Sequence, residues 1–147
     1  MNTGRSSQRI AALVIAVAIF AQAAPALAEA TIIDPKTWCG DFSRLVAEGK
    51  DAAIGEALHS GSLGNIDPAG ALVALAPMTA LVKSDKVNSV SFLAQKNYAD
   101  AFERDWYMIV IGPKPTFLRC SFIRVSDDQW QLTDFDFNTS VDELPLP

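Results

Sequence analysis

The sequence predicts a single α+β domain, in which three N-terminal helices pack on an antiparallel sheet of about four strands. Apolar residues recur at helical spacing up to residue 82, and short alternating or wholly apolar runs follow from residue 87 onward. Helices followed by strands, rather than alternating with them, indicate the α+β class. The chain has 147 residues, which is the length of about one domain.

Residues 1–28 have the layout of a secretory signal peptide. Arg5 and Arg9 precede an unbroken apolar run at residues 10–20, and small residues lead up to Ala28. As a helix this run would span about 16 Å, whereas the hydrocarbon core of a bilayer is about 30 Å thick. We therefore expect cleavage after Ala28 and a periplasmic or secreted location, with retention as an uncleaved anchor as the alternative. The expected domain then covers residues 29–140, and residues 141–147 form a flexible tail.

Two Asp-Pro pairs mark the starts of helices. Asp34-Pro35 and Asp67-Pro68 each place an N-cap residue before a proline at the first helical position. The apolar spacing predicts helices at residues 35–48 and 69–82, with a weaker one at 50–59. Pro77 should kink the third helix or end it early.

Four strands follow the helices. The predicted ranges are 87–98, 104–111, 116–125 and 130–137, with turns at residues 112–115 and at Asp127-Asp128. Cys39 and Cys120 are the only two cysteines. In an exported protein an even count favours a disulfide, so we expect these two to be paired.

The turn lengths give a provisional register. A two- or four-residue loop at 112–115 places Ile109 opposite Leu118 and Tyr107 opposite Cys120, and the second turn places Cys120 opposite Phe135 and Ile123 opposite Leu132. If Cys120 faces the helices, so do the residues that share its face: Tyr107, Ile109, Ile111, Leu118, Phe122, Phe135 and Phe137.

The opposite face of the sheet remains apolar, although one layer of helices cannot cover it. Such a surface indicates an interface with another chain, most simply a second copy. A β-bulge near Thr133-Asp134 is the alternative, because it would turn Trp130 and Leu132 toward the core. The expected interface residues are Trp106, Met108, Val110, Ile123, Trp130 and Leu132, with Val125 on the same face.

The last two strands carry a family resemblance. Phe117-Leu118-Arg119-Cys120-Ser121-Phe122 is followed by Gln129-Trp130-Gln131-Leu132-Thr133-Asp134-Phe135-Asp136-Phe137-Asn138. With three preceding helices, this terminal strand pattern resembles small exported members of the nuclear transport factor 2-like (cystatin-like) superfamily. The resemblance implies a cone made by helices on a curved sheet, and pairing of two copies through the sheet. It does not imply a function, because the superfamily includes enzymes, ligand binders and interaction modules.

Enzymes of this superfamily use a pocket between the sheet and the helices, where an isomerase needs a carboxylate base and a hydrogen-bond donor. The provisional register points Tyr107, Asp105 and Arg124 toward that side. Several large aromatic side chains would tend to fill such a pocket, so we favour a non-enzymatic binding or interaction module. Its ligand would be a partner chain, a second copy or a small apolar molecule, and an isomerase- or dehydratase-like enzyme is the alternative.

Composition and motifs exclude several other classes of function. The net charge of −5 disfavours nucleic acid as a partner. After signal cleavage no segment is apolar enough to span a membrane. The single histidine, His59, and the cysteine pair do not form a metal-ligand pattern, and we expect no metal and no cofactor.

Overall fold

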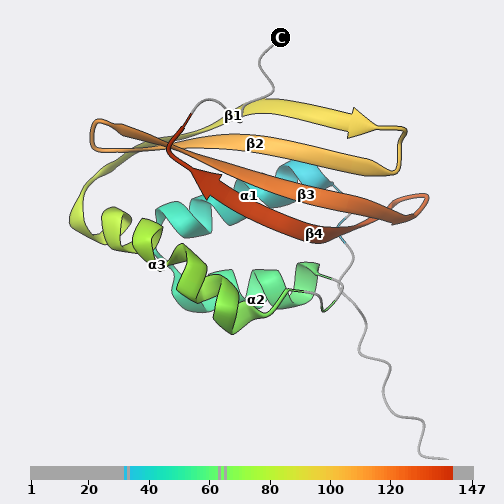
Figure 1. The fold of residues 1–147 in the computed structure, drawn as a ribbon, viewed down its shortest axis with the longest axis horizontal. Coiled ribbons are helices and arrows are strands. Elements are labelled where there is room, and N and C mark those ends of the chain that lie inside the picture. Colours follow the sequence, from blue (N-terminus) through green and yellow to red (C-terminus); the bar gives the residue numbers. More distant parts are fainter. Residues whose placement is uncertain (1–31, 33, 63, 65, 141–147) are drawn as a thin grey trace, which may run out of the picture.

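The fold consists of three helices on one face of a four-stranded antiparallel sheet (Figure 1). The computed structural model describes residues 32, 34–62, 64 and 66–140, so the predicted leader at 1–28 and the tail at 141–147 lie outside the described residues. The strands follow one another in the order β1-β2-β3-β4. The α+β prediction is confirmed. The elements are α1 (Pro35–Ala47), α2 (Asp51–Gly61), α3 (Pro68–Ser84), β1 (Val87–Tyr98), β2 (Phe102–Ile111), β3 (Lys114–Ser126) and β4 (Gln129–Asn138).

The Asp-Pro pairs begin helices as predicted. The Asp34 carboxylate accepts hydrogen bonds from the backbone N–H and the hydroxyl of Thr37, at 3.3 and 2.6 Å. The Asp67 carboxylate accepts from the backbone N–H groups of Ala69 and Gly70, at 3.1 and 2.9 Å. These caps satisfy N–H groups that have no partner within the helix. Pro77 lies inside α3, and the helix continues through it to Ser84, so the expected early end is wrong.

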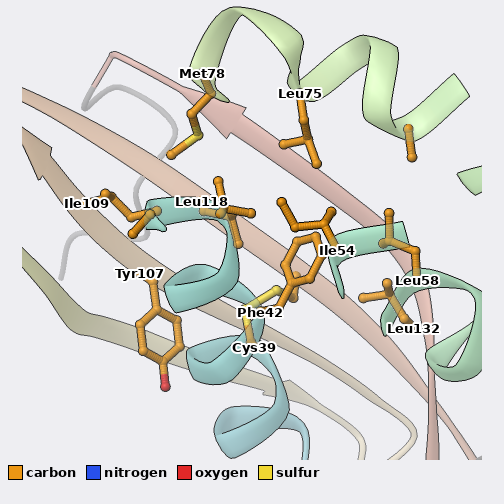
Figure 2. Packing of buried hydrophobic residues seen from close by; sticks show 14 of the residues in the cluster. Cys39, Phe42, Ile54, Leu58, Leu75, Met78, Tyr107, Ile109, Leu118 and Leu132 are labelled. Carbon is orange, nitrogen blue, oxygen red and sulfur yellow. A yellow bond between two sulfur atoms is a disulfide. The ribbon is translucent and has the colours of Figure 1, made fainter. Parts of the chain in front are cut away.

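The core lies between the helices and the sheet (Figure 2). Phe42 of α1, Ile54 of α2 and Leu75 of α3 are at most 1% exposed and meet Leu118 from the sheet. Cys39 of α1 and Cys120 of β3 form a disulfide across this layer, with their Cα atoms 6.0 Å apart. The disulfide therefore fastens α1 to the centre of the sheet. Among the described residues no helix is both long and apolar enough to cross a membrane.

The register between β2 and β3 differs from the expected one by two residues. The turn is tight at Gly112-Pro113, with Ile111 opposite Lys114, so Tyr107 lies opposite Leu118 and Asp105 opposite Cys120. Gly112 adopts a φ of +56°, which glycine tolerates without strain. Because a shift of two residues preserves the alternation of faces, Tyr107 still points toward the helices.

A β-bulge at Thr133 changes the direction of the first half of β4. Cys120 lies opposite Phe135 as expected, but Phe122 pairs with Leu132 and Ile123 with Gln131, so Thr133 is the extra residue. Leu132 is consequently 0% exposed and belongs to the core, and Trp130 packs against the core from the same side. The expected placement of Trp130 and Leu132 on the outer face is therefore wrong, and the bulge considered as the alternative is present.

Candidate functional site

The two predicted pocket residues of β2 lie beneath α1, away from solvent. Asp105 is 0% exposed and Tyr107 is 8% exposed. The Tyr107 hydroxyl donates a 2.8 Å hydrogen bond to the backbone carbonyl of Lys36 in α1. Gly40 allows this close approach, because a Cβ atom there would lie 2.8 Å from the Tyr107 hydroxyl. The predicted pocket is thus closed by α1, and Figure 2 shows Tyr107 beside this helix.

Burial makes Asp105 a weak acid. Its carboxyl oxygens accept no hydrogen bond from an N–H or hydroxyl group of the described residues, and the carboxyl group hydrogen-bonds with that of Glu103. Burial, followed by the charge of Glu103 on the same strand face, raises the pKa of Asp105 to about 8. Burial and the neighbouring Asp105 also raise the pKa of Tyr107. At neutral pH Asp105 is therefore mostly protonated, which lets the carboxyl group stay in the core without a full charge.

Arg124 does not join Asp105 and Tyr107. It lies near the β3–β4 turn, where its guanidinium donates to the backbone carbonyl of Asp127. The guanidinium carbon also lies 5.7 Å from the centre of the Trp130 ring. Of the three predicted pocket residues, the structure brings together two, and it gives Arg124 a role in holding a turn.

An open groove lies between the first half of α3 and β4, and no residue of α1 lines it. Its volume is about 370 Å³. Small residues of α3 form one wall, and the half-buried ring of Phe135 forms part of the other. The bulge at Thr133 lies at the start of the second wall. The lining residues are Ile66, Asp67, Gly70, Ala71, Ala74, Thr133, Asp134 and Phe135.

The groove runs beside the edge of the sheet, because β4 is the last strand in the order. Two short segments of the chain already pair with this edge: Ile32 bridges Trp130 in antiparallel fashion, and Ser62 bridges Leu132 in parallel fashion. Within the described part of the chain, no segment pairs with this edge over residues 134–138. The groove therefore combines an apolar wall with unpaired strand backbone.

The outer face of the sheet holds four of the six predicted interface residues. Trp106 lies near the middle of this face and is only 5% exposed, while Met108 and Val110 are half-buried. Ile123 is 39% exposed, beside Tyr98 at 37% and Val125 at 44%, at the end that carries the β1–β2 and β3–β4 turns. Three exposed apolar side chains thus gather at this end of the face.

Sequence reasoning missed the groove between α3 and β4. A signal was present, since Gly70, Ala71 and Ala74 leave one face of α3 without large side chains near its start. The apolar spacing predicts a helix over residues 69–82 and no groove. Whether small residues leave a groove or let two elements pack closely depends on the distance between α3 and the sheet, and local spacing does not set that distance.

The chain matches no family model and no curated protein. Among solved structures it is similar to a DUF4783 family protein from Bacteroides ovatus ATCC 8483, with 13% identity, a TM-score of 0.45, and coverage of 66% of this chain and 90% of that chain. A DUF4783 family protein from Bacteroides uniformis ATCC 8492 gives 15% identity, a TM-score of 0.44, and coverage of 69% and 94%. Membership of the nuclear transport factor 2-like superfamily stays a prediction.

Proposed function

We propose that this protein is an exported, non-enzymatic binding module that holds an apolar ligand or a segment of a partner chain in the groove between α3 and β4. The groove itself carries the proposal. Its volume of about 370 Å³ falls within the usual range of ligand sites, and its walls combine apolar side chains with a few polar groups. Phe135 offers a half-buried aromatic surface that a ligand would cover.

The placement of the titratable groups supports binding rather than acid–base catalysis. A general base must come within hydrogen-bond reach of the proton that it removes. Asp105 is 0% exposed, and the Tyr107 hydroxyl already donates to the Lys36 carbonyl. An isomerase-like reaction would require α1 to move away from the sheet, where the Cys39–Cys120 disulfide holds it.

The export component of the proposal rests on the leader-like segment at residues 1–28 and on the disulfide. Disulfides persist mainly in oxidising compartments outside the cytosol. Mass spectrometry of the protein from a bacterial periplasmic fraction tests this component. We expect a chain that begins at Glu29, and an intact Met1 in the membrane fraction would contradict cleavage.

Nile red, a neutral apolar dye, tests the groove. We expect its fluorescence to rise on binding to the purified protein, and we expect Ala74→Phe to abolish the rise because the new ring fills the groove. Val73→Phe is the matched control, since Val73 is on the same helix, is 74% exposed and does not line the groove. Unchanged dye binding by the Ala74→Phe variant would contradict the proposal.

Pairing of two copies through the outer face is a second candidate. One observation favours it. The exposed side chains of Tyr98, Ile123 and Val125 share this face with charged residues of opposite sign. Lys96 of β1 and Arg104 of β2 are positive, and Asp134 and Asp136 of β4 are negative. A two-fold axis would bring these opposite charges together. Light scattering after size exclusion tests it, with Ile123→Glu expected to convert a dimer to a monomer. A monomeric wild-type protein would contradict this candidate.

A further inference from the structure

We infer that the occupant of the groove is an extended peptide segment of another protein, with alternating apolar and basic residues, that adds to β4 as a fifth strand. The inference rests on the proposed function, since it names the ligand class for the same groove. It is carried by three features of the described residues: the unpaired edge of β4, the shape of the groove beside that edge, and the charges along the strand.

The edge of β4 already accepts two isolated β-bridges from its own chain. The backbone N–H of Ile32 donates to the Trp130 carbonyl at 3.0 Å, and the N–H of Trp130 donates to the Ile32 carbonyl at 2.7 Å. Ser62 then bridges Leu132. Among the described residues, no pairing with this edge follows Leu132. Residues 134–138 continue as regular strand for about 17 Å at roughly 3.4 Å per residue. An added strand would extend the backbone pairing along β4 beyond Leu132.

This part of the edge holds no proline, lysine or bulge, and its charged side chains are two aspartates. Proline, lysine and bulges commonly blunt an edge strand. Residues 134–138 read Asp-Phe-Asp-Phe-Asn, and their pairing with β3 is regular. Both edge strands carry two register shifts, but those of β4 lie before residue 134, whereas β1 holds Lys96 in its regularly paired end. The two edges therefore differ in their readiness to pair, and β4 is the accessible one.

The groove gives an added strand a place for every second side chain. Phe135 and Phe137 point toward the helices and are half-buried, so an added strand would present its own side chains beside them. Gly70 and Ala74 on α3 are exposed and leave space opposite. Side chains on this face of the peptide would therefore be apolar.

The other face of β4 selects for positive charge. Asp134 and Asp136 point to the outer face, with side chains 58% and 47% exposed. Both lie near a single guanidinium, that of Arg119, at 3.1 and 3.8 Å, which leaves one negative charge in excess. Basic residues directly opposite would be favoured, and acidic ones would be repelled. The same repulsion disfavours pairing of β4 with β4 of a second copy.

A designed peptide tests the inference. The probe is acetyl-Lys-Val-Lys-Val-Lys-Val-amide, titrated into the purified protein with backbone amide exchange followed by NMR. We expect exchange to slow at least ten-fold at saturation for those amides of residues 134–138 that point to the edge. The Ala74→Phe variant should bind at least ten-fold more weakly, and Val73→Phe should bind as the wild type does.

Two control peptides separate strand addition from other modes of binding. N-methylation of alternate residues removes the hydrogen-bond donors from one edge of the peptide, and glutamate in place of lysine reverses its charge. We expect both changes to weaken binding at least ten-fold. Equal binding of the N-methylated peptide would overturn strand addition, and equal binding of the glutamate peptide would overturn the charge selection.

The dye experiment distinguishes failure of this inference from failure of the proposed function. If Nile red binds in the groove and the lysine–valine peptide does not bind, the groove holds an apolar ligand and the inference of a peptide is wrong. If neither the dye nor the peptide binds at the groove, both proposals are wrong.

Discussion

The two sides of the helix-facing surface of the sheet are built differently. On the side of β1 and β2, α1 packs directly against the strands, and the Tyr107 hydroxyl bonds to its backbone. On the side of β4, small residues of α3 face the strand and leave a groove of about 370 Å³. The titratable groups that suggested chemistry lie on the closed side, and the space for a ligand lies on the open side. This separation supports the proposed binding role.

Removal of the disulfide should have the largest effect on this arrangement, because it holds the closed side together. Cys39 and Cys120 are 81 residues apart in the sequence. In the chain-entropy model, closing such a loop contributes about 4.5 kcal/mol to stability, as an upper figure. We expect the Cys39→Ala/Cys120→Ala variant to lose roughly 3–4.5 kcal/mol in urea unfolding. Reduction of the wild-type protein should reproduce the loss, and a loss below about 1 kcal/mol would contradict it.

The bulge at Thr133 decides which side chains of β4 belong to the core. Leu132 is 0% exposed, whereas Ile123, which the simple register places opposite it, is 39% exposed. We expect Leu132→Ala to cost roughly 2–4 kcal/mol, because truncation of a buried leucine leaves a cavity. Ile123→Ala should cost less than about 1 kcal/mol. Equal losses in thermal or urea unfolding would mean that β4 does not carry the bulge.

The order and type of the elements could be predicted because local signals agree. The Asp34-Pro35 and Asp67-Pro68 pairs began both helices that they were expected to begin, and the alternation of residues after position 87 gave four strands. Which side of β2 faces the helices was also predictable, since a two-residue error in the turn leaves the faces unchanged.

The remaining features depend on contacts between distant residues. The apolar spacing around Thr133 fits both a straight strand and a bulged one, and only packing of Leu132 against Phe122 in the core distinguishes them. Asp105 and Arg124 both point to the helix side by pattern, yet α1 covers one and the other holds the β3–β4 turn. The groove likewise depends on how α3 sits beside β4.

Burial of Asp105 beneath α1 should make the protein less stable as the pH rises. The pKa of Asp105 is about 8 in the folded protein against an ordinary value of 3.8. Between these two values the unfolded chain has released the proton and the folded chain retains it, so rising pH favours unfolding. We expect a loss of roughly 2–3 kcal/mol between pH 5 and pH 7, measured by urea unfolding.

The Asp105→Asn variant is the control for this pH dependence. An amide of nearly the same shape does not titrate, so the stability of this variant should change much less between pH 5 and pH 7. A wild-type protein whose stability does not fall over this range would contradict the raised pKa of Asp105.

Binding of the peptide at β4 should depend only weakly on a single surface charge. Asp134 lines the groove and its side chain is 58% exposed, so Asp134→Asn removes one negative charge beside the proposed strand. A surface charge pair contributes about 0.5 kcal/mol, which corresponds to binding of the lysine–valine peptide that is two- to three-fold weaker.

Asp128→Asn makes the same change in net charge at the β3–β4 turn, away from the groove lining. We expect the Asp128 variant to bind as the wild type does and the difference between the two variants to shrink with added salt, because surface charges are screened. Equal weakening by the two substitutions would mean that the peptide responds to the overall charge of the protein and not to the carboxylates along β4.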